Sequence, residues 1–540
     1  MTDAVLGQIP HDEPAAARPD LDKKPNPIGA IAFLVVLLGG LAFAASSIFT
    51  DTAHVGQTLA VGAFLFLGLA LLIALGFEFV NGFHDTANAV ATVIYTHSMP
   101  PLVAVVWSGF FNFLGVLTSS GAVAFGIVTL LPVELILNVG SGAGYAMIFA
   151  LLLAAIIWNL GTWALGIPNS SSHALVGSIM GVGLTNQWMA PAGQATSGVD
   201  WSQAQKVFTT LLISPVVGFV GAALLLLLMK LTVRSKKLYT APTGDQPPPW
   251  WIRGLLILTC TSVSFGHGSN DGQKGMGLIM LILIGSAPTA YALNRTMSDS
   301  SAPAFIASAQ KAQGLFAAHA QGQAAMDVPA ARTKVGDALK VKKVDDPTVI
   351  EALSVISGDI AANVKSYGSV RQVPAAATPN LRNDMYLASD AIKALGKSKT
   401  FNADEQKALK GYSDGLNKGT RFIPNWVKIC VALALGLGTM VGWKRIVVTV
   451  GEKIGKTHLT YGQGAAAEVT AAITILAADN FGLPVSTTHV LSSGVAGTML
   501  ANGSGLQWGT LRSIALAWIT TLPAAMAISG TLYFIFRHLV

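Results

Sequence analysis

The sequence predicts an all-α polytopic membrane protein. We expect two inverted-topology repeats with broken helices and re-entrant-type Ser/Thr loops, plus a small helical soluble insert. Composition is the first observation, because 52% of the 540 residues are hydrophobic and only 11% are charged, against about a quarter charged in soluble proteins. The second is that apolar runs continue for ~20 residues, which suits membrane helices and not the short alternating segments of a barrel. The third is that two polar motifs each occur twice.

The first repeated motif places charged and amide side chains between apolar runs. Its copies read Asn-Gly-Phe-His-Asp-Thr-Ala-Asn over 81–88 and Ser-Phe-Gly-His-Gly-Ser-Asn-Asp-Gly-Gln-Lys-Gly-Met-Gly over 264–277. Aligning Asp85 with Asp271 pairs Asn81 with His267, His84 with Asn270, and Asn88 with Lys274. Burying a charge at bilayer depth costs at least ~2.5–3.5 kcal/mol, so these groups indicate a functional site.

The second repeated motif is a loop rich in hydroxyl groups. Gly-Ile-Pro-Asn-Ser-Ser-Ser-His over 166–173 matches Gly-Leu-Pro-Val-Ser-Thr-Thr-His over 482–489. Asp85 lies 88 residues before His173, whereas Asp271 lies 218 residues before His489. The difference of 130 is nearly the length of the one hydrophilic block, 291–421. Without that block the two halves fall into register, which indicates an internal duplication.

The first half follows in order from the amino terminus. Residues 1–27 are polar and Pro-rich and are expected to form a disordered tail, and 28–56 an N-terminal transmembrane helix and loop. The first membrane repeat is expected over 57–232. Its signature segment, 57–95, is too long for one simple helix and should break within the membrane. Further spans are expected at Pro101–Leu131, Gly144–Leu165 and Val207–Thr232.

The second half begins after a Pro-rich cytoplasmic linker, 233–251. Its two parts are expected over 252–290 and 422–540, with spans at Pro424–Trp443, Gly464–Ala478 and near 510–536. Between them, 291–421 contains 17 of the 34 Lys and Arg residues and predicts a soluble helical insert. Cys260 and Cys430 both lie in apolar segments, so the sequence offers no disulfide framework and no metal cluster.

The distribution of basic residues predicts the topology. Arg18, Lys23 and Lys24 precede the first span, and Arg234, Lys236, Lys237 and Arg253 flank the 233–251 linker. The positive-inside rule then places the N-terminus and the linker in the cytoplasm and the insert outside, in the periplasm of an inner-membrane protein. The two signature segments start on opposite sides, as an inverted repeat requires. The same rule explains the formal charge of +7 without a nucleic-acid partner.

The Ser/Thr loops suit an anion. In each, Pro breaks a helix and the next helix opens with several hydroxyls and unpaired backbone N–H groups, which converge at the positive end of a helix dipole. Two facing loops could surround a tetrahedral oxyanion through Ser170, Ser171, Ser172, Ser486, Thr487 and Thr488. The alternative is that these hydroxyls only cap or bond back to helix backbone. His173 and His489 either pack or contact the same ligand.

The carboxylates suit the opposite charge. Asp85 and Asp271 could bind a cation or carry a proton, although a buried Asp can also simply cap a broken helix. Lys274 could neutralise Asp271 or fill the space of a sodium ion. Three further acids lie in apolar segments: Glu78, Glu468 and Asp479. Glu468 is the strongest candidate of these, because it is isolated in an Ala-rich helix.

At these motifs the chain resembles the Pit-type inorganic phosphate transporters, particularly the bacterial low-affinity, proton-coupled members. The family signature is Gly-Ala-Asn-Asp-Val-Ala-Asn, once per half, paired with the Ser/Thr loops. Here 82–88 reads Gly-Phe-His-Asp-Thr-Ala-Asn and 268–274 reads Gly-Ser-Asn-Asp-Gly-Gln-Lys. His84 and Lys274 each replace an Asn of the family form, and these departures resemble the proton-coupled branch.

The resemblance implies a secondary active transporter that imports inorganic phosphate, also as a neutral divalent metal–phosphate complex, by proton symport. Alternating access would occur at a midplane site between the repeats. Phosphate would contact the six loop hydroxyls together with Asn88 and Asn270, and coupling would involve His84, Asp85, Asp271, Lys274 and Glu468. No cofactor is implied. The identity of any metal ligand and the formation of a homodimer stay open.

Two other functional classes, a hydrolase and a sensor, explain fewer features of the sequence. An intramembrane hydrolase would use Ser, His and Asp, but it does not explain why each motif occurs twice, and no Ser lies in a nucleophile elbow. A sensor would bind its ligand in 291–421 and use the membrane part as an anchor, but an anchor needs no buried acids. The absence of a Walker-type loop argues against direct ATP drive.

Overall fold

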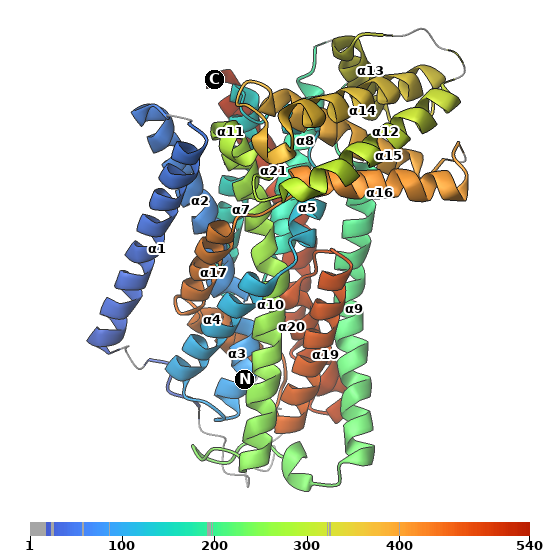
Figure 1. Ribbon diagram of the computed structural model, residues 1–540. Coiled ribbons are helices and arrows are strands. Elements are labelled where there is room, and N and C mark those ends of the chain that lie inside the picture. Colours follow the sequence, from blue (N-terminus) through green and yellow to red (C-terminus); the bar gives the residue numbers. More distant parts are fainter. Residues whose placement is uncertain are drawn as a thin grey trace.

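The computed structural model describes residues 18–22, 26–56, 59–85, 87–191, 196, 198–320, 322, 326–398 and 400–539, without the side chains of Ala87 and Asn88. Its regular secondary structure in these ranges is helical (Figure 1). The predicted all-helical class is therefore confirmed. Most of the tail predicted to be disordered lies outside the described residues.

The first half contains nine α-helices within the described residues. They are α1 (Pro27–His54), α2 (Val61–Asp85), α3 (Ala87–Tyr95), α4 (Pro101–Thr118), α5 (Ala122–Val128), α6 (Val133–Leu137), α7 (Gly142–Ala164), α8 (Ser171–Trp188) and α9 (Trp201–Thr232). The predicted single span Pro101–Leu131 is wrong. The chain leaves α4 at Thr118 and enters α5 after Gly121, whose φ of 85° lies in the left-handed region that glycine adopts most readily.

The membrane helices of the second half lie on both sides of the insert in the sequence. They are α10 (Trp250–Ser286), α11 (Pro288–Tyr291), α17 (Asn425–Thr439), α18 (Lys444–Glu452), α19 (Tyr461–Asn480), α20 (Thr487–Asn502) and α21 (Trp508–Leu539), and the 3-10 turn η1 (Lys236–Tyr239) precedes them. The first signature segment divides into α2 and α3, as expected. The second does not, because it lies inside the 37 continuous residues of α10.

Close packing explains why the glycines of the second signature do not break α10. A Cβ added at Gly268 would lie 2.1 Å from the carbonyl oxygen of Asn112 on α4, and one at Gly115 of α4 would lie 2.1 Å from the carbonyl oxygen of Phe265. Small residues at such positions let two membrane helices approach backbone to backbone. The glycines therefore serve the α4–α10 contact, and the helix stays regular.

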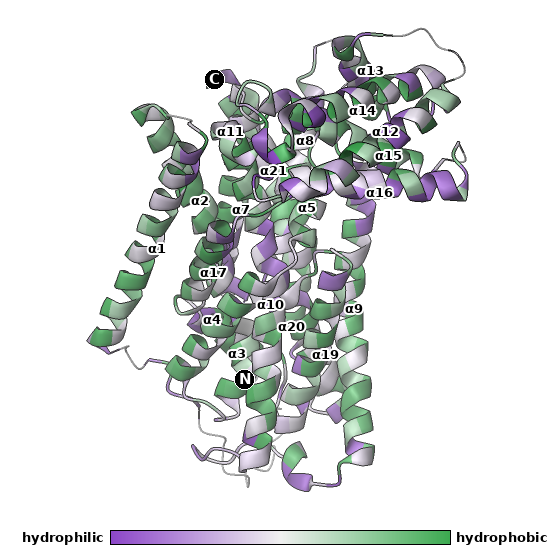
Figure 2. Cartoon of the chain, viewed as in Figure 1, coloured by the Kyte–Doolittle hydropathy of each residue, from purple (hydrophilic) through white to green (hydrophobic). Residues whose placement is uncertain are grey.

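The insert forms a helical body at one end of the molecule, opposite the linker between α9 and α10 (Figure 1). Its main helices are α12 (Ala302–His319), α13 (Val328–Val341), α14 (Pro347–Tyr367), α15 (Thr378–Leu395) and α16 (Ala403–Thr420), with short turns η2 (Asp299–Ser301) and η3 (Val370–Gln372). These helices pack around a hydrophobic core of their own. Hydrophilic residues are frequent on them, whereas the helices below are mostly hydrophobic (Figure 2).

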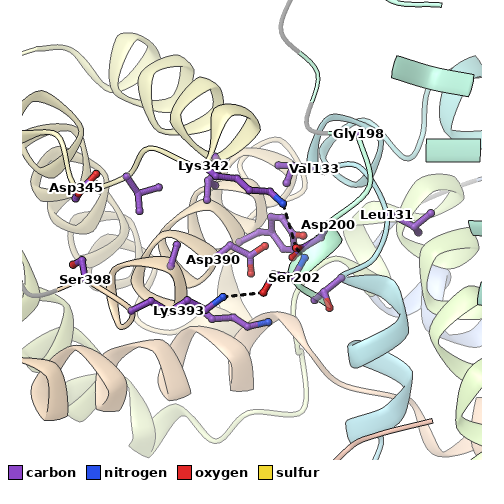
Figure 3. Close-up of a pocket in the computed structure, with 16 residues that line it drawn as sticks. Leu131, Val133, Gly198, Asp200, Ser202, Lys342, Asp345, Asp390, Lys393 and Ser398 are labelled. Carbon is purple, nitrogen blue, oxygen red and sulfur yellow. Dashed lines mark hydrogen bonds and ion pairs between the residues drawn. The ribbon is translucent and has the colours of Figure 1, made fainter. Parts of the chain in front are cut away.

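A few polar contacts join the insert to the membrane part. Lys342 Nζ lies 3.3 Å from Asp200 Oδ1 at the start of α9, and Lys397 Nζ donates to Ser202 Oγ at 3.1 Å. These contacts border a cavity of about 430 Å³ between the two parts (Figure 3). Buried Arg382 donates to the carbonyl oxygen of Ile136, 3.1 Å away. Polar side chains on or just after α13 and α15 thus link the insert to the membrane part.

Six segments of the described chain are long and apolar enough to cross a membrane. They are Pro27–His54, Val61–Tyr95, Pro101–Thr118, Gly142–Ala164, Trp201–Thr232 and Trp508–Leu539. A seventh is possible if Ala403–Thr420 and Asn425–Thr439, bent by 71°, form one span. Their outward faces are hydrophobic, as expected for contact with lipid (Figure 2).

The two halves pack reciprocally. Helix α9 of the first half lies along α20 of the second, and α21 of the second half lies along α8 of the first. The approach is close in both pairs: a Cβ at Gly497 would lie 2.1 Å from the carbonyl oxygen of Phe219, and one at Gly181 would lie 2.2 Å from that of Met526. Helices α2 and α10 run in opposite directions (Figure 1). This arrangement brings the four motifs together.

Candidate functional site

Helices α8 and α20 each begin at one of the Ser/Thr loops. Ser170 is the N-cap of α8 and accepts from His173 N at 3.2 Å, and Ser486 is the N-cap of α20 and accepts from His489 N at 3.2 Å. The first hydroxyl of each loop therefore caps its own helix, which is the structural role that the sequence left open. The ring of His173 also contacts Ser170, with 2.8 Å between Nδ1 and Oγ.

The next hydroxyls of the two loops meet on one carboxylate. Asp85 is the last residue of α2, where the helix breaks. Its Oδ2 accepts from Ser171 Oγ at 2.6 Å, and its Oδ1 accepts from Thr488 Oγ1 at 2.7 Å. His84 Nδ1 lies 3.3 Å from Asp85 Oδ1, and its Nε2 lies 3.2 Å from Thr162 Oγ1 on α7. Asp85 thus links both loops to the first signature.

The second carboxylate pairs with the lysine of its own motif. Lys274 Nζ lies 2.6 Å from Asp271 Oδ2, one turn along α10. The same ammonium donates to Ser172 Oγ. Ser171 Oγ is 3.5 Å from Asp271 Oδ2, so its hydroxyl lies between the two aspartates. Lys274 therefore supplies a positive charge directly at the meeting point of α8 and α10.

Other side chains of the motifs bind the backbone of the second loop, and one loop hydroxyl has no partner among the described residues. Asn270 Nδ2 donates to Leu483 O at 3.1 Å, and Asn270 Oδ1 accepts from Val485 N at 3.3 Å. Ser172 Oγ donates to Val485 O at 3.0 Å. In the described part of the chain, Thr487 Oγ1 is buried and has no hydrogen-bond partner. Asn270 therefore positions the second loop, and Thr487 retains an unused hydroxyl at the start of α20.

One candidate residue, Glu468, does not join this cluster in the described structure. The carboxylate of Glu468 accepts from Thr92 on α3 and Thr259 on α10, so it bridges other helices. The side chain of Asn88 lies outside the described residues. The two loop histidines do meet, since the ring centroids of His173 and His489 are 4.5 Å apart, and His489 stacks on Trp518 at 3.9 Å.

One histidine at the site was not among the sequence candidates. His267 Nε2 lies 3.7 Å from Asp271 Oδ2, and its Nδ1 lies 2.7 Å from Asn112 Oδ1. Ligand atoms of Asp85, His267 and Asp271 all lie within 4.8 Å of one another, close enough for one small cation to contact all three. The spacing of four residues between His267 and Asp271 places them on one helix face and could have indicated this contact.

The cluster is closed to solvent. Asp85, Ser171, Asp271, Lys274 and Thr488 are each at most 2% exposed. Two carboxylates, one ammonium and several hydroxyls are thus enclosed at the junction of the halves. Uncompensated charges are costly in such surroundings, so any ligand must bring or displace a compensating charge.

Comparison with known proteins identifies the family. The model of the PHO4 phosphate transporter family matches residues 81–529. The chain belongs to the phosphate transporter family. It is 44% identical over 497 residues to the low-affinity inorganic phosphate transporter PitA of Escherichia coli (strain K12), covering 88% of this chain and 98% of the relative. It is 42% identical over 499 residues to PitB of the same organism, covering 89% and 99%.

A more distant relative is a probable low-affinity inorganic phosphate transporter of Bacillus subtilis (strain 168), 29% identical over 468 residues and covering 86% of this chain and 96% of the relative. A solved structure of a sodium-dependent phosphate transporter aligns with a TM-score of 0.48 and 20% identity, covering 88% of this chain and 99% of that one. The predicted Pit-type membership is confirmed. So is the prediction that this protein is not an enzyme.

Proposed function

We propose that this protein imports inorganic phosphate as a secondary active transporter, by proton symport. The observation that carries the proposal is the convergence of Ser171 and Thr488, one from each repeated loop, on the carboxylate of Asp85. Residues that could bind an anion and a residue that could bind a proton thereby share the same hydrogen bonds. Occupation of one site must then affect the other.

The substrate site of the proposal lies between the N-termini of α8 and α20. Helix N-termini favour anions through free N–H groups and the helix dipole. Phosphate would contact Ser171, Ser172, Thr487 and Thr488, with Asn88 and Asn270 as further candidate ligands. Ser170 and Ser486, which cap α8 and α20, would hold the helix N-termini in place. The unpartnered hydroxyl of Thr487 supports this position, because a buried donor without an acceptor is costly until a ligand arrives. A neutral divalent metal–phosphate complex would lower the cost of bringing the anion close to two carboxylates.

The coupling step follows from the hydrogen bonds of Asp85. Ionised Asp85 accepts from Ser171 and Thr488 and so occupies both donors. A proton on Asp85 would remove its negative charge and release these hydroxyls to donate to a phosphate oxygen. Proton and phosphate would thus enter together. His84 Nδ1 lies 3.3 Å from Asp85 Oδ1, so its imidazole would serve as the relay for that proton.

Lys274 supports protons over sodium as the coupling ion. Its ammonium lies 2.6 Å from Asp271, so the charge of that carboxylate is already neutralised. A sodium ion at Asp271 would have to displace the ammonium or lie beside it against Coulomb repulsion. Glu468, which accepts from two hydroxyls and no cation among the described residues, is the further proton-carrying candidate of this proposal.

Alternating access between two inverted repeats is the proposed transport cycle. The opposed directions of α2 and α10 and the reciprocal packing of α9 on α20 and α21 on α8 support it. We place the protein in the inner membrane with its N-terminus in the cytoplasm and the insert in the periplasm. The ion pairs Arg18–Glu452 and Asp22–Lys444 support this orientation, because they hold residues 18–22 against α18, whose two ends carry basic residues.

Uptake of radiolabelled phosphate by purified protein in liposomes tests the proposal. An inward pH gradient in sodium-free buffer should drive uptake, whereas a sodium gradient at symmetric pH should not. Protein-free liposomes provide the baseline, and uptake with and without magnesium tests transport of the metal complex. Uptake that follows the sodium gradient and ignores the pH gradient would contradict proton symport.

A further inference from the structure

Glu78 is a fully buried carboxylate of α2 that the cluster around Asp85 does not include. It is 0% exposed and lies two helical turns before Asp85. Its Oε1 accepts from the backbone N–H of Gly275 at 2.7 Å, and its Oε2 accepts from Asn81 Nδ2 at 3.3 Å. Both donors are neutral. In the described structure no cation forms an ion pair with Glu78.

The charged groups that face Glu78 belong to α10. They are Lys274 and Asp271, which pair with each other at 2.6 Å. The Lys274 charge is therefore shared with another carboxylate. A second negative charge at Glu78 lacks its own counter-ion, and a buried carboxylate in that position gains from binding a proton.

The contact with Gly275 holds Glu78 between two helices that carry the signatures. A Cβ at residue 275 would lie 2.3 Å from Glu78 Oε1, so only glycine allows this approach. The amide of a glutamine could accept the same backbone hydrogen bond in the same space. The helix contact therefore explains the length and polarity of residue 78, but it does not require an ionisable group.

Asn81 offers a partner for a proton on Glu78. Asn81 Oδ1 is buried and lacks a hydrogen-bond partner among the described residues, whereas its Nδ2 donates to Glu78. A half-turn of this amide would exchange the two atoms, and Oδ1 could then accept from a protonated Oε2. Ionised Glu78 accepts a hydrogen bond from Asn81 Nδ2, and protonated Glu78 could donate one to Asn81 Oδ1. Both protonation states thus have a partner without movement of the backbone.

We propose that Glu78 is a proton-binding residue of the transport cycle, which takes up and releases a proton between α2 and α10 without contacting phosphate. The inference rests on the proposed proton symport. It adds a proton site in the first half, on the helix that ends at Asp85, and it assigns Asn81 the role of positioning residue. Because both helices carry a signature motif, a charge change at Glu78 reaches both halves of the substrate site.

Glu78→Gln separates proton coupling from substrate binding. Phosphate counterflow, the exchange of labelled external for unlabelled internal phosphate at symmetric pH, should stay within about twofold of wild type, since the helix contact is kept. Accumulation driven by a pH gradient should fall by about tenfold per pH unit, the contribution of one coupled proton. Glu78→Asp, which keeps the titratable group, should recover part of the driven uptake.

Asp479→Asn is the matched control. Asp479 also accepts from neutral donors, Ser269 Oγ and Gln273 Nε2, both at 2.6 Å, but lies outside the proposed coupling path. It should retain pH-driven accumulation. Wild-type accumulation by Glu78→Gln would overturn the inference, and so would loss of counterflow in a Glu78→Gln protein that melts at the wild-type temperature. Absence of phosphate counterflow in the wild type would instead contradict the proposed function.

A second measurement needs no variant. Dicyclohexylcarbodiimide reacts with protonated carboxyl groups in apolar surroundings, and peptide mass spectrometry locates the adduct. Labelling of Glu78 in wild-type protein should be stronger at about pH 6 than at about pH 9, because only the protonated acid reacts. Labelling that is absent at both values, or equal at both, would overturn the inference even if Glu78→Gln fails to insert.

Discussion

The hydroxyl of Thr488 donates to Asp85 across 2.7 Å, although 403 residues separate them in the chain. Ser171 binds the other oxygen of the same carboxylate. Asp85 and Ser171 come from the first half, and Thr488 comes from the second. Neither half therefore contains the complete environment of this carboxylate.

Asp85→Asn should abolish driven phosphate uptake while the protein remains folded and inserted. The two hydroxyls donate to different oxygens of Asp85, and asparagine has an NH₂ donor in place of one of them, so it cannot accept both bonds in this geometry and cannot carry a transported proton. Proteoliposome uptake and the melting temperature in detergent measure the two effects. Asp337→Asn, an exposed acid of the insert paired with Lys340, is the control and should transport normally. Near-normal uptake by Asp85→Asn would reassign Asp85 to structure.

Asp271 and Lys274 should depend on each other for stability. Removing one partner of a buried pair leaves an uncompensated charge and costs about 3–5 kcal/mol. Asp271→Asn and Lys274→Met should therefore each destabilise the protein, and the double variant should regain much of the loss. All three should fail to transport. Thermal unfolding of the four proteins gives the coupling energy, and additive losses would show that the two residues do not act as a pair.

The hydroxyls of each loop should divide into two classes. Ser171→Ala and Thr488→Val should raise the KM for phosphate by about ten- to a hundredfold if each removes a hydrogen bond to a charged group. Ser170→Ala and Ser486→Ala remove helix caps and should cost about 1 kcal/mol of stability. KM values and melting temperatures of the four variants test this division. The same KM shift in all four would mean that the caps also contact phosphate.

Deletion of 295–418 behind a short Gly/Ser linker should leave measurable uptake. The insert has its own hydrophobic core, and the two membrane halves meet without it at Asp85. The deletion removes the Lys342–Asp200 ion pair and exposes the cavity beneath the insert, so some stability should be lost (Figure 3). Lys342→Ala in the full-length chain is the control for that contact alone. A correctly inserted deletion protein without any uptake would show that the insert takes part in transport.

The duplicated motifs predicted more of the site than any single segment could. Their spacing indicated that Asp85, Asp271 and the two loops belong together, because duplication relates positions that are far apart in the chain. The sequence did not reveal which hydroxyl meets which carboxylate, since Ser170 and Ser171 are neighbours with different roles. The contact of Glu78 with the backbone of Gly275 was also hidden, because no residue pattern marks a backbone donor on another helix.

Glycine patterns were the weakest guide to the fold. Gly121 has a positive φ and lies in the turn that leads into α5, whereas Gly268 lies inside a regular helix and serves close packing. Both look alike in the sequence. Which role a glycine has depends on the neighbouring helix, here α4 against α10, and that neighbour comes from a distant part of the chain.

The reciprocal packing of α9 on α20 and of α21 on α8 has a consequence for biosynthesis. The first half is synthesised before α20 and α21, so the faces of α8 and α9 that these helices cover have no partner at that stage. The same packing holds the two halves together through helix contacts that do not depend on the peptide chain between them. If the chain is divided within the insert and the two parts are expressed together, they should associate in the same membrane and form one transporter.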